Sequence, residues 1–338
     1  MNLLKLKCSN AFDGVVSLEI TGDIKCIRSE SFKVCYSLTK ITIPSSVTKI
    51  ESYAFLGCSF LTQISNLSSV TEIGYYAFDG CSSLTQISIP SVTLIEEYTF
   101  SGCYSLTQIT LSSSLQKIGD YAFYECKSLA QISFPSSVNK IGKYAFYECS
   151  SLKEISIPYI REIESYTFSE CTSLIQITIP SYVSSIGSSA FKYCSSLKEI
   201  SIPSSVRSIG DCAFEGCSSL TQISIPSSVT EIKECTFLSC ESLKKVTFLE
   251  PSSVTSFGKS AFSGCKNLSQ ILIPSSVKSI EDNAFSYCSY LMKLTIPSSV
   301  TSLGKDVFKD CNYLTLSIPS SLDIQNKGID PKIKIIRI

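Results

Sequence analysis

The chain has 338 residues, with 29 Lys and Arg against 29 Asp and Glu, and no His. Without an imidazole there is no general base for a Ser-His-Asp or Cys-His site and no histidine metal ligand, which excludes most hydrolase and zinc chemistry. The net charge is zero and both signs are dispersed, so binding to nucleic acid or to an anionic membrane surface is disfavoured, because both need a basic face.

One sequence unit is copied along most of the chain. Thirteen cysteines, each three residues after a phenylalanine, recur from Cys35 to Cys311 with a mean spacing of 23 residues. The unit reads C-x-x-L-x-x-I-x-I-P-S-S-V-x-x-I-x-x-x-A-F-x-x. A unit this short gains too little from its own apolar residues to offset the entropy of ordering its backbone, so the units must stack. The repeat therefore predicts a solenoid.

Each unit contains two short elements. The stretch L-x-x-I-x-I ends in alternating β-branched residues and is closed by Pro-Ser-Ser, which predicts a short strand followed by a turn. The stretch V-x-x-I-x-x-x-A-F has helical apolar spacing, but its β-branched start and the Gly that often follows Ile disfavour an α-helix. We expect a second extended segment that leads into a tight turn, 3₁₀ at Ala-Phe.

The unit resembles the BspA-like (treponemal-type) leucine-rich repeat from about Val15 to Leu322. The resemblance implies an α/β-type leucine-rich-repeat solenoid, a right-handed arc of about 14 turns. Its parallel β-sheet would lie on the concave face, with short extended or 3₁₀ segments on the convex face. Family members are surface proteins of bacteria and parasitic protists, so the resemblance also implies adhesion to host matrix proteins or cells.

The two ends of the chain predict caps on this solenoid. We expect an N-terminal cap at residues 1–14, the solenoid at 15–322 and a C-terminal capping strand at 323–338, with Ile333 and Ile335 on its apolar face. The first residues lack the apolar run of a secretory signal, and the last residues lack a membrane span or a lipid-anchor tail. Localisation stays open, because these ends favour the cytoplasm whereas the family resemblance implies the cell surface.

The cysteines divide into one repeat column and four others. The thirteen repeated cysteines are predicted to be small buried hydrophobes. Neighbouring copies would hold their Cβ atoms about 5 Å apart, whereas a disulfide needs about 3.8 Å. Cys212 and Cys235 could join Cys217 and Cys240 in a four-thiolate zinc site, but the latter two belong to the buried column and should point away. We predict no metal and no cofactor.

Function is expected at the variable positions of the sheet. The residue between the two isoleucines and the residue two positions before it form a surface of hydroxyls edged by amides. Charged and apolar residues break this pattern toward the C-terminus. The predicted ligand-binding residues of the concave face are Gln131, Ser133, Lys153, Glu154, Ser156, Gln176, Thr178, Lys198, Glu199, Ser201, Gln222, Ser224, Lys244, Lys245, Gln270, Leu272, Met292 and Lys293.

A tyrosine stripe precedes the Ala-Phe or Thr-Phe pair in six consecutive units. Such rings either stack in a half-buried ladder or form an alternative contact surface, because Tyr is enriched at interface hot spots. The stripe comprises Tyr53, Tyr76, Tyr98, Tyr121, Tyr144 and Tyr166.

One unit departs from the repeat. Asn66 stands at a core isoleucine position, where we expect it either to turn its amide to free backbone groups or to shift the strand register. Asn66-Leu-Ser68 and Asn267-Leu-Ser269 are also N-glycosylation sequons, which arise readily by chance in a serine-rich chain.

The sequence thus predicts a non-enzymatic protein that presents an extended concave surface to a protein ligand, such as a host matrix or cell-surface protein, or to a glycan. No phosphate loop, C-x-x-C pair or nucleophile elbow is present. We expect no nucleic-acid partner and no direct membrane insertion. The alternative is an intracellular scaffold or regulator of a partner enzyme.

Overall fold

The computed structural model describes Gly14 and residues 16–338. The chain divides into two compact units: unit 1 comprises Met1–Ile160 and Glu170–Thr172, and unit 2 comprises Arg161–Ser169 and Ser173–Ile338. Each unit is a parallel β-solenoid, and the chain makes about 14 turns in all. The predicted solenoid is confirmed, whereas the predicted cap at residues 1–14 lies outside the described residues except for Gly14.

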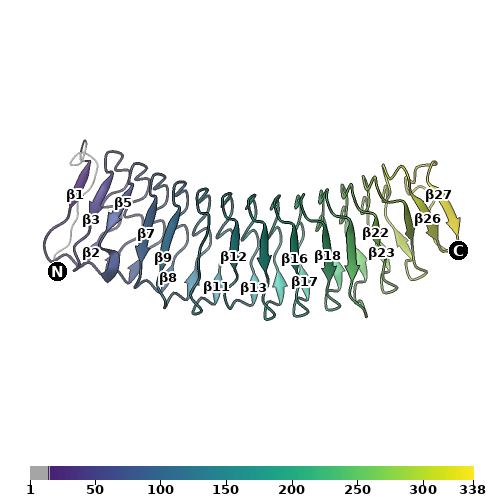
Figure 1. Cartoon of the computed structure of the whole chain (residues 1–338), viewed down its shortest axis with the longest axis horizontal. Coiled ribbons are helices and arrows are strands. Elements are labelled where there is room, and N and C mark those ends of the chain that lie inside the picture. Colours follow the sequence, from purple (N-terminus) through teal and green to yellow (C-terminus); the bar gives the residue numbers. More distant parts are fainter. Residues whose placement is uncertain (1–13, 15) are drawn as a thin grey trace. The chain divides into compact units, whose positions relative to one another are not determined.

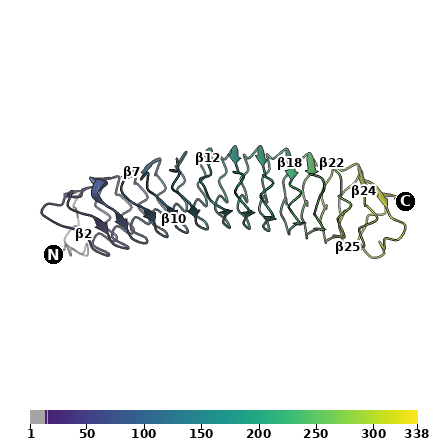
Figure 2. The same ribbon diagram turned by 90° about the horizontal axis from the view of Figure 1, so that it is seen from below.

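Most turns of the coil contain a long strand, a short strand and a turn segment. The two sets of strands lie on opposite sides of the coil (Figures 1 and 2). The long strands of unit 1 are β1 (Ser17–Glu19), β3 (Lys40–Thr42), β5 (Gln63–Ser65), β7 (Gln86–Ile89), β9 (Gln108–Leu111) and β12 (Glu154–Ser156). Those of unit 2 are β14 (Gln176–Thr178), β16 (Glu199–Ser201), β18 (Gln222–Ile225), β20 (Lys245–Phe248), β22 (Gln270–Ile271), β24 (Lys293–Thr295), β26 (Thr315–Ile318) and β27 (Lys334–Arg337).

The short strands are two residues long, and each ends at the last residue of the V-x-x-I stretch, which is Ile in most turns. In unit 1 they are β2 (Cys26–Ile27), β4 (Lys49–Ile50), β6 (Glu72–Ile73), β8 (Leu94–Ile95), β10 (Lys117–Ile118) and β11 (Lys140–Ile141). In unit 2 they are β13 (Glu162–Ile163), β15 (Ser185–Ile186), β17 (Ser208–Ile209), β19 (Glu231–Ile232), β21 (Ser256–Phe257), β23 (Ser279–Ile280) and β25 (Ser302–Leu303).

Strands of successive turns pair in parallel, with equivalent repeat positions opposite one another. Ile41 of β3 pairs with Ile64 of β5, and Ile223 of β18 pairs with Val246 of β20. This register places every inward residue over its copy in the next turn. The turn that contains Ser133 is an exception, because residues 130–135 form no strand.

The turn segment after each short strand is not the 3₁₀ turn that the sequence predicts. Among the described residues the one 3₁₀ helix is η1 (Leu67–Ser69), so the α/β description is not supported. The reason is a pair of left-handed residues in each segment, such as Tyr53 at φ 63° and Gly57 at φ 69°. A helix cannot pass through them. Their N–H groups instead donate to the next turn, to Tyr75 O at 2.9 Å and Asp79 O at 2.7 Å.

The core consists of columns of identical side chains. The Phe rings of successive turns stack, as Phe55 and Phe78 do with centroids 5.2 Å apart and planes 4° from parallel. These rings and the Ile, Leu and Val columns are almost wholly shielded from solvent. Stacking therefore supplies the burial that one unit lacks on its own.

The repeated cysteines are buried, as predicted, but they do more than fill space. From Cys58 to Cys311, each thiol donates a hydrogen bond to the carbonyl of the phenylalanine in the preceding turn, at 2.8 to 3.3 Å. Cys126, for example, bonds Phe100 O at 3.2 Å. Cys35 is buried as well, but it is disulfide-bonded rather than a free thiol.

A strand, β27, occupies Lys334–Arg337 within the segment 323–338 that was predicted to cap the solenoid. β27 pairs in parallel with β26, and Arg337 Nη1 donates to the carbonyl oxygens of Pro319, Ser320 and Leu322. The expected apolar face is only half correct: Ile333 is buried, whereas Ile335 is 37% exposed.

Candidate ligand-binding surface

We define the long-strand face as the surface formed by two sets of side chains. One set is the outward side chains of the long strands, and the other is the side chain of the residue just before each long strand. All eighteen residues predicted for ligand binding are exposed on this face or directly beside it. Five of them, from Gln131 to Ser156, lie in unit 1, and the other thirteen lie in unit 2. The residues of each unit are therefore described by themselves.

Within unit 2 the strand register brings the predicted residues side by side. Gln176 pairs with Glu199, and Thr178 pairs with Ser201. Two strands further on, Gln222 pairs with Lys245. Paired strands lie about 4.8 Å apart, so these polar groups form continuous rows.

The C-terminal part of the long-strand face combines positive charge with exposed apolar groups. Leu272 is 76% exposed and Met292 is 61% exposed, although most apolar side chains of the chain are buried. Lys244, Lys245 and Lys293 are exposed on the same face. Within the described part of the chain, none of these three ammonium groups forms an ion pair. Their charge is therefore available to a ligand.

Two shallow depressions lie on this face in unit 2. The first has a volume of about 580 Å³ and extends over β14, β16 and β18, with Glu199 and Leu249 among its lining residues. The second has a volume of about 340 Å³, and Lys245, Glu250 and Leu272 line it. Both are open hollows on a sheet, a shape that suits a surface-to-surface contact better than enclosure of a small molecule.

The tyrosine stripe forms a stacked ladder in unit 1. The rings of Tyr76, Tyr98, Tyr121 and Tyr144 stack at 4.5 to 4.6 Å, and Tyr53 joins them at 5.1 Å. Burial and the neighbouring tyrosines raise the pKa of Tyr98 to about 12. The ladder accordingly presents ring edges and hydroxyls rather than open ring faces. Tyr166 belongs to unit 2.

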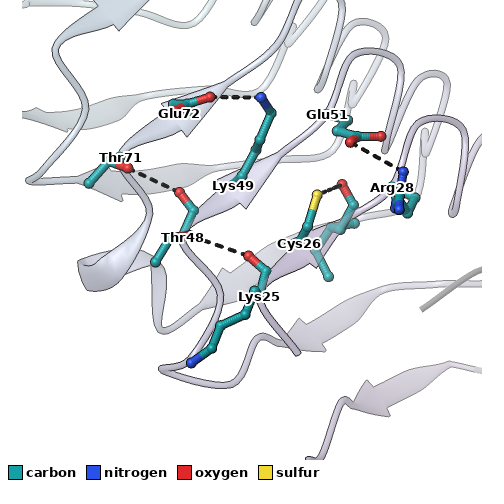
Figure 3. Close-up of polar contacts among 9 residues, drawn as sticks. Lys25, Cys26, Arg28, Thr48, Lys49, Glu51, Thr71 and Glu72 are labelled. Atoms are coloured by element: carbon teal, nitrogen blue, oxygen red, sulfur yellow. Dashed lines mark hydrogen bonds and ion pairs between the residues drawn. The ribbon is translucent and has the colours of Figure 1, made fainter. Parts of the chain in front are cut away.

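A third depression, which was not predicted from the sequence, lies on the short-strand side of unit 1. It has a volume of about 560 Å³, with the exposed side chains of Tyr75 and Leu94 at its wall and the carboxylates of Glu51, Glu72 and Glu96 around it. Leu94 was the available signal, because it stands in a column that holds Cys26 in the first turn and Lys, Glu or Ser in all the others. Figure 3 shows the adjacent ion pairs, Lys49 with Glu72 at 2.8 Å and Arg28 with Glu51 at 3.8 Å, and the bonds from the Thr48 and Thr71 hydroxyls to the carbonyls of Lys25 and Thr48.

Neither predicted role for Asn66 is seen on the side of β3. Its side chain makes no capping hydrogen bond, and the register of the strand before it is unchanged, since Ser65 still pairs with Thr42. Asn66 instead adopts a left-handed conformation at φ 66° and ends β5. Asn tolerates this conformation better than most residues.

The four cysteines considered for zinc do not form a metal site. Cys217 and Cys240 are buried and bond phenylalanine carbonyls, whereas Cys212 and Cys235 are partly exposed. Burial and Glu215 raise the pKa of Cys212 to about 12, which keeps it protonated. Across Gly14 and residues 16–338, no group of three or more Cys, Asp or Glu is arranged to hold a metal ion.

In the same described residues, no helix has both the length and the apolar character needed to cross a bilayer.

Comparison with known proteins agrees with the repeat. The model of the BspA type leucine rich repeat region matches residues 8–106, 93–221 and 207–329. No protein with a curated description matches the chain.

Several solved structures are similar. A leucine-rich repeat protein from Bacteroides ovatus has 27% identity and a TM-score of 0.67, with 96% of this chain and 92% of that chain covered. A leucine rich cell surface protein from Faecalibacterium prausnitzii has 30% identity and a TM-score of 0.53, with 89% and 82% covered. The pneumococcal vaccine antigen PcpA, at 19% identity and a TM-score of 0.55 over 98% and 85%, shares the fold. The chain therefore belongs to the family of BspA-type leucine-rich repeat proteins.

Proposed function

We propose that the protein is a non-enzymatic binding protein and that the long-strand face of unit 2 engages a protein ligand. The observation that carries this proposal is the group of exposed apolar and unpaired cationic side chains at Lys244, Lys245, Leu272, Met292 and Lys293. From Thr42 to Thr295, Leu272 is the one apolar residue in a column otherwise filled by Ser and Thr, whereas the lysine positions are also charged in other turns, as at Lys153 and Lys198. The group therefore departs from the copied pattern mainly through its exposed apolar side chains.

The chemistry of the group indicates the kind of ligand. Leu272 and Met292 offer apolar area that a partner would remove from water, at about 25 cal/mol per Å². The neighbouring lysines would add attraction to carboxylates, which raises the association rate and fixes orientation. We therefore expect a partner surface with acidic side chains around at least one apolar side chain.

We propose that the protein binds its ligand at the cell surface and acts as an adhesin. The support is the description of the Faecalibacterium prausnitzii relative as a cell surface protein. Free thiols favour a second candidate, an intracellular scaffold or enzyme regulator, because fifteen described cysteines are free and reducing compartments preserve thiols. Antibody labelling decides between them: labelling of intact cells supports the adhesin, and labelling only after permeabilisation supports the scaffold.

The binding proposal is tested by capture with the full chain as bait. Extracellular matrix proteins and cell extracts are passed over the immobilised protein, and retained proteins are identified by mass spectrometry. The double variant Lys244→Glu and Lys245→Glu should weaken retention at least tenfold. The matched control, Lys278→Glu and Lys305→Glu, changes the charge equally outside the long-strand face and should leave retention intact.

Two outcomes would reject the proposal. One is that no protein is retained above background. The other is that the two double variants behave alike, because binding would then depend on net charge or on another face.

A further inference from the structure

A hollow on the long-strand face of unit 1 differs in character from every other depression described above. It has a volume of about 450 Å³ and extends over β5, β7 and β9 beside Asn66.

The hollow lies where Asn66 breaks the repeat. The neighbouring strand β7 continues to Ile89, whereas β5 ends at Ser65, where the left-handed Asn66 turns the chain into η1. Leu67 then fills the core in place of the missing isoleucine and is 3% exposed.

No residue that lines the hollow carries a charge. Its polar groups are the amides of Gln63, Gln86 and Gln108 with the hydroxyls of Ser65, Ser88 and Thr110, above a floor of buried Ile64 and Ile87. The hollows elsewhere contain Glu51, Glu199, Lys245 or Lys259. The surface at β5 to β9 is therefore electrically neutral, whereas the other hollows carry charged groups.

Neutral hydrogen-bonding groups select a neutral ligand. A charged ligand would lose hydration here without meeting a counter-charge, which is costly. A ligand rich in hydroxyls, by contrast, can both donate to and accept from each amide and hydroxyl. Apart from one bond of 3.4 Å between Gln63 Nε2 and Ser65 Oγ, the glutamine side chains of the hollow form no hydrogen bond within the described residues.

The polar groups also recur at a fixed spacing. Ser88 pairs with Thr110 and Gln86 pairs with Gln108, so each row advances by one strand separation, about 4.8 Å, from turn to turn. A row of this kind suits a ligand that repeats its own hydroxyl groups along a chain.

We propose that this hollow is a binding site for a neutral oligosaccharide. The ligand would lie across β5, β7 and β9, with its hydroxyl groups on the glutamine amides and its apolar ring surface on the isoleucine floor. The site lies in unit 1 and shares no residue with the protein-binding surface proposed in unit 2.

The test is a binding measurement with defined sugars and repeat-matched variants. The full chain is screened against neutral oligosaccharides of glucose, galactose, mannose and N-acetylglucosamine, and against sialylated and sulfated counterparts. Binding of the best neutral sugar is then measured by calorimetry. Gln86→Glu with Gln108→Glu keeps the side-chain shape but adds two charges to the hollow, and should weaken binding about tenfold or more.

The control is the same change at equivalent positions of unit 2, Gln176→Glu with Gln222→Glu. It should leave sugar binding unchanged, and thermal melts of both variants establish that each folds. The proposal is overturned if no neutral sugar binds, if charged sugars bind more tightly than neutral ones, or if both double variants lose binding equally. Protein capture through Lys244 and Lys245 is measured separately, so either proposal can fail while the other stands.

Discussion

The thiol column offers a direct test of how the solenoid is held together. Cys126 is fully buried in unit 1, and its Sγ donates to Phe100 O at 3.2 Å. We consider the variants Cys126→Ala and Cys126→Ser. Alanine removes both the sulfur and the donor, whereas serine removes the sulfur but keeps a donor in nearly the same place.

The expected losses follow from these two contributions. Removing the hydrogen bond costs about 0.5 to 1.5 kcal/mol, and removing one buried heavy atom costs about 1 kcal/mol. Phe100 O keeps its bond from Cys103 N at 3.2 Å, so no carbonyl is left without a donor. Cys126→Ala should therefore lower the free energy of unfolding by about 2 kcal/mol.

The order of the two variants separates two explanations of the column. If the cysteines were only small hydrophobes, serine would be the worse substitute, because an unpaired buried hydroxyl costs about 1 to 3 kcal/mol. If the thiol donor matters, Cys126→Ser should be at least as stable as Cys126→Ala. Denaturant unfolding followed by circular dichroism measures the difference, with the same pair at Cys217 as a repeat in unit 2. A serine variant clearly less stable than the alanine variant at both sites would refute the donor role.

Three further predictions follow from the ladders. Tyr121→Gly should be more stable than Tyr121→Ala by about 1 kcal/mol in denaturant unfolding, because both lose the stacking but only glycine relieves the left-handed strain at φ 57°; equal stabilities would contradict it. The melting temperature should fall as pH rises from about 10 through 12. The reason is that the pKa of Tyr98 and that of Tyr124 are raised to about 12 in the folded protein, against about 10 in the unfolded chain. Equal melting temperatures at pH 9 and pH 11 would argue against this prediction. Among the described thiols that are not disulfide-bonded, a maleimide at pH 8.5 should label the partly exposed Cys26 and Cys235 in the folded chain, Cys212 more slowly because its pKa is raised to about 12, and the buried column only in denaturant, as judged by peptide mass spectrometry; rapid labelling of Cys126 in the folded chain would show that the column is open.

The features that every unit shares could be predicted from the sequence. The Ile-x-Ile alternation predicted the long strands, and the pairing of Ile41 with Ile64 follows from stacking equivalent positions. Burial of the cysteine column also followed from its constant place in the unit. These features depend on polarity and spacing, which the sequence displays directly.

The turn segments could not be predicted in the same way. Tyr53 and its copies adopt a left-handed conformation that tyrosine does not favour by itself, because inter-turn hydrogen bonds and ring stacking outweigh the local preference. Asn283 and Asp306 occupy the same position in later turns, and these residue types tolerate positive φ. They were the one signal in the sequence that this position is left-handed.

The candidate surfaces were predicted only in part. Exposure of Leu272 and Met292 could be read from their places beside the core isoleucines. The hollow at Asn66 could not, because it depends on where η1 carries Leu67. The hollow beside Tyr75 and Leu94 is lined by residues of three neighbouring short strands, so it could not be predicted from the sequence of any one unit.

The central claim is that the long-strand face of unit 2 contacts a protein ligand, and hydroxyl-radical footprinting of the complex tests it most directly. Oxidation of Leu272 and Met292 is compared between the free and the bound protein, with Tyr287, 48% exposed on a turn segment of the same unit, as the internal reference. We predict that the ligand protects Leu272 and Met292 and leaves Tyr287 unchanged. Protection of Tyr287 with continued oxidation of Leu272 and Met292 would place the ligand on another face and contradict the claim.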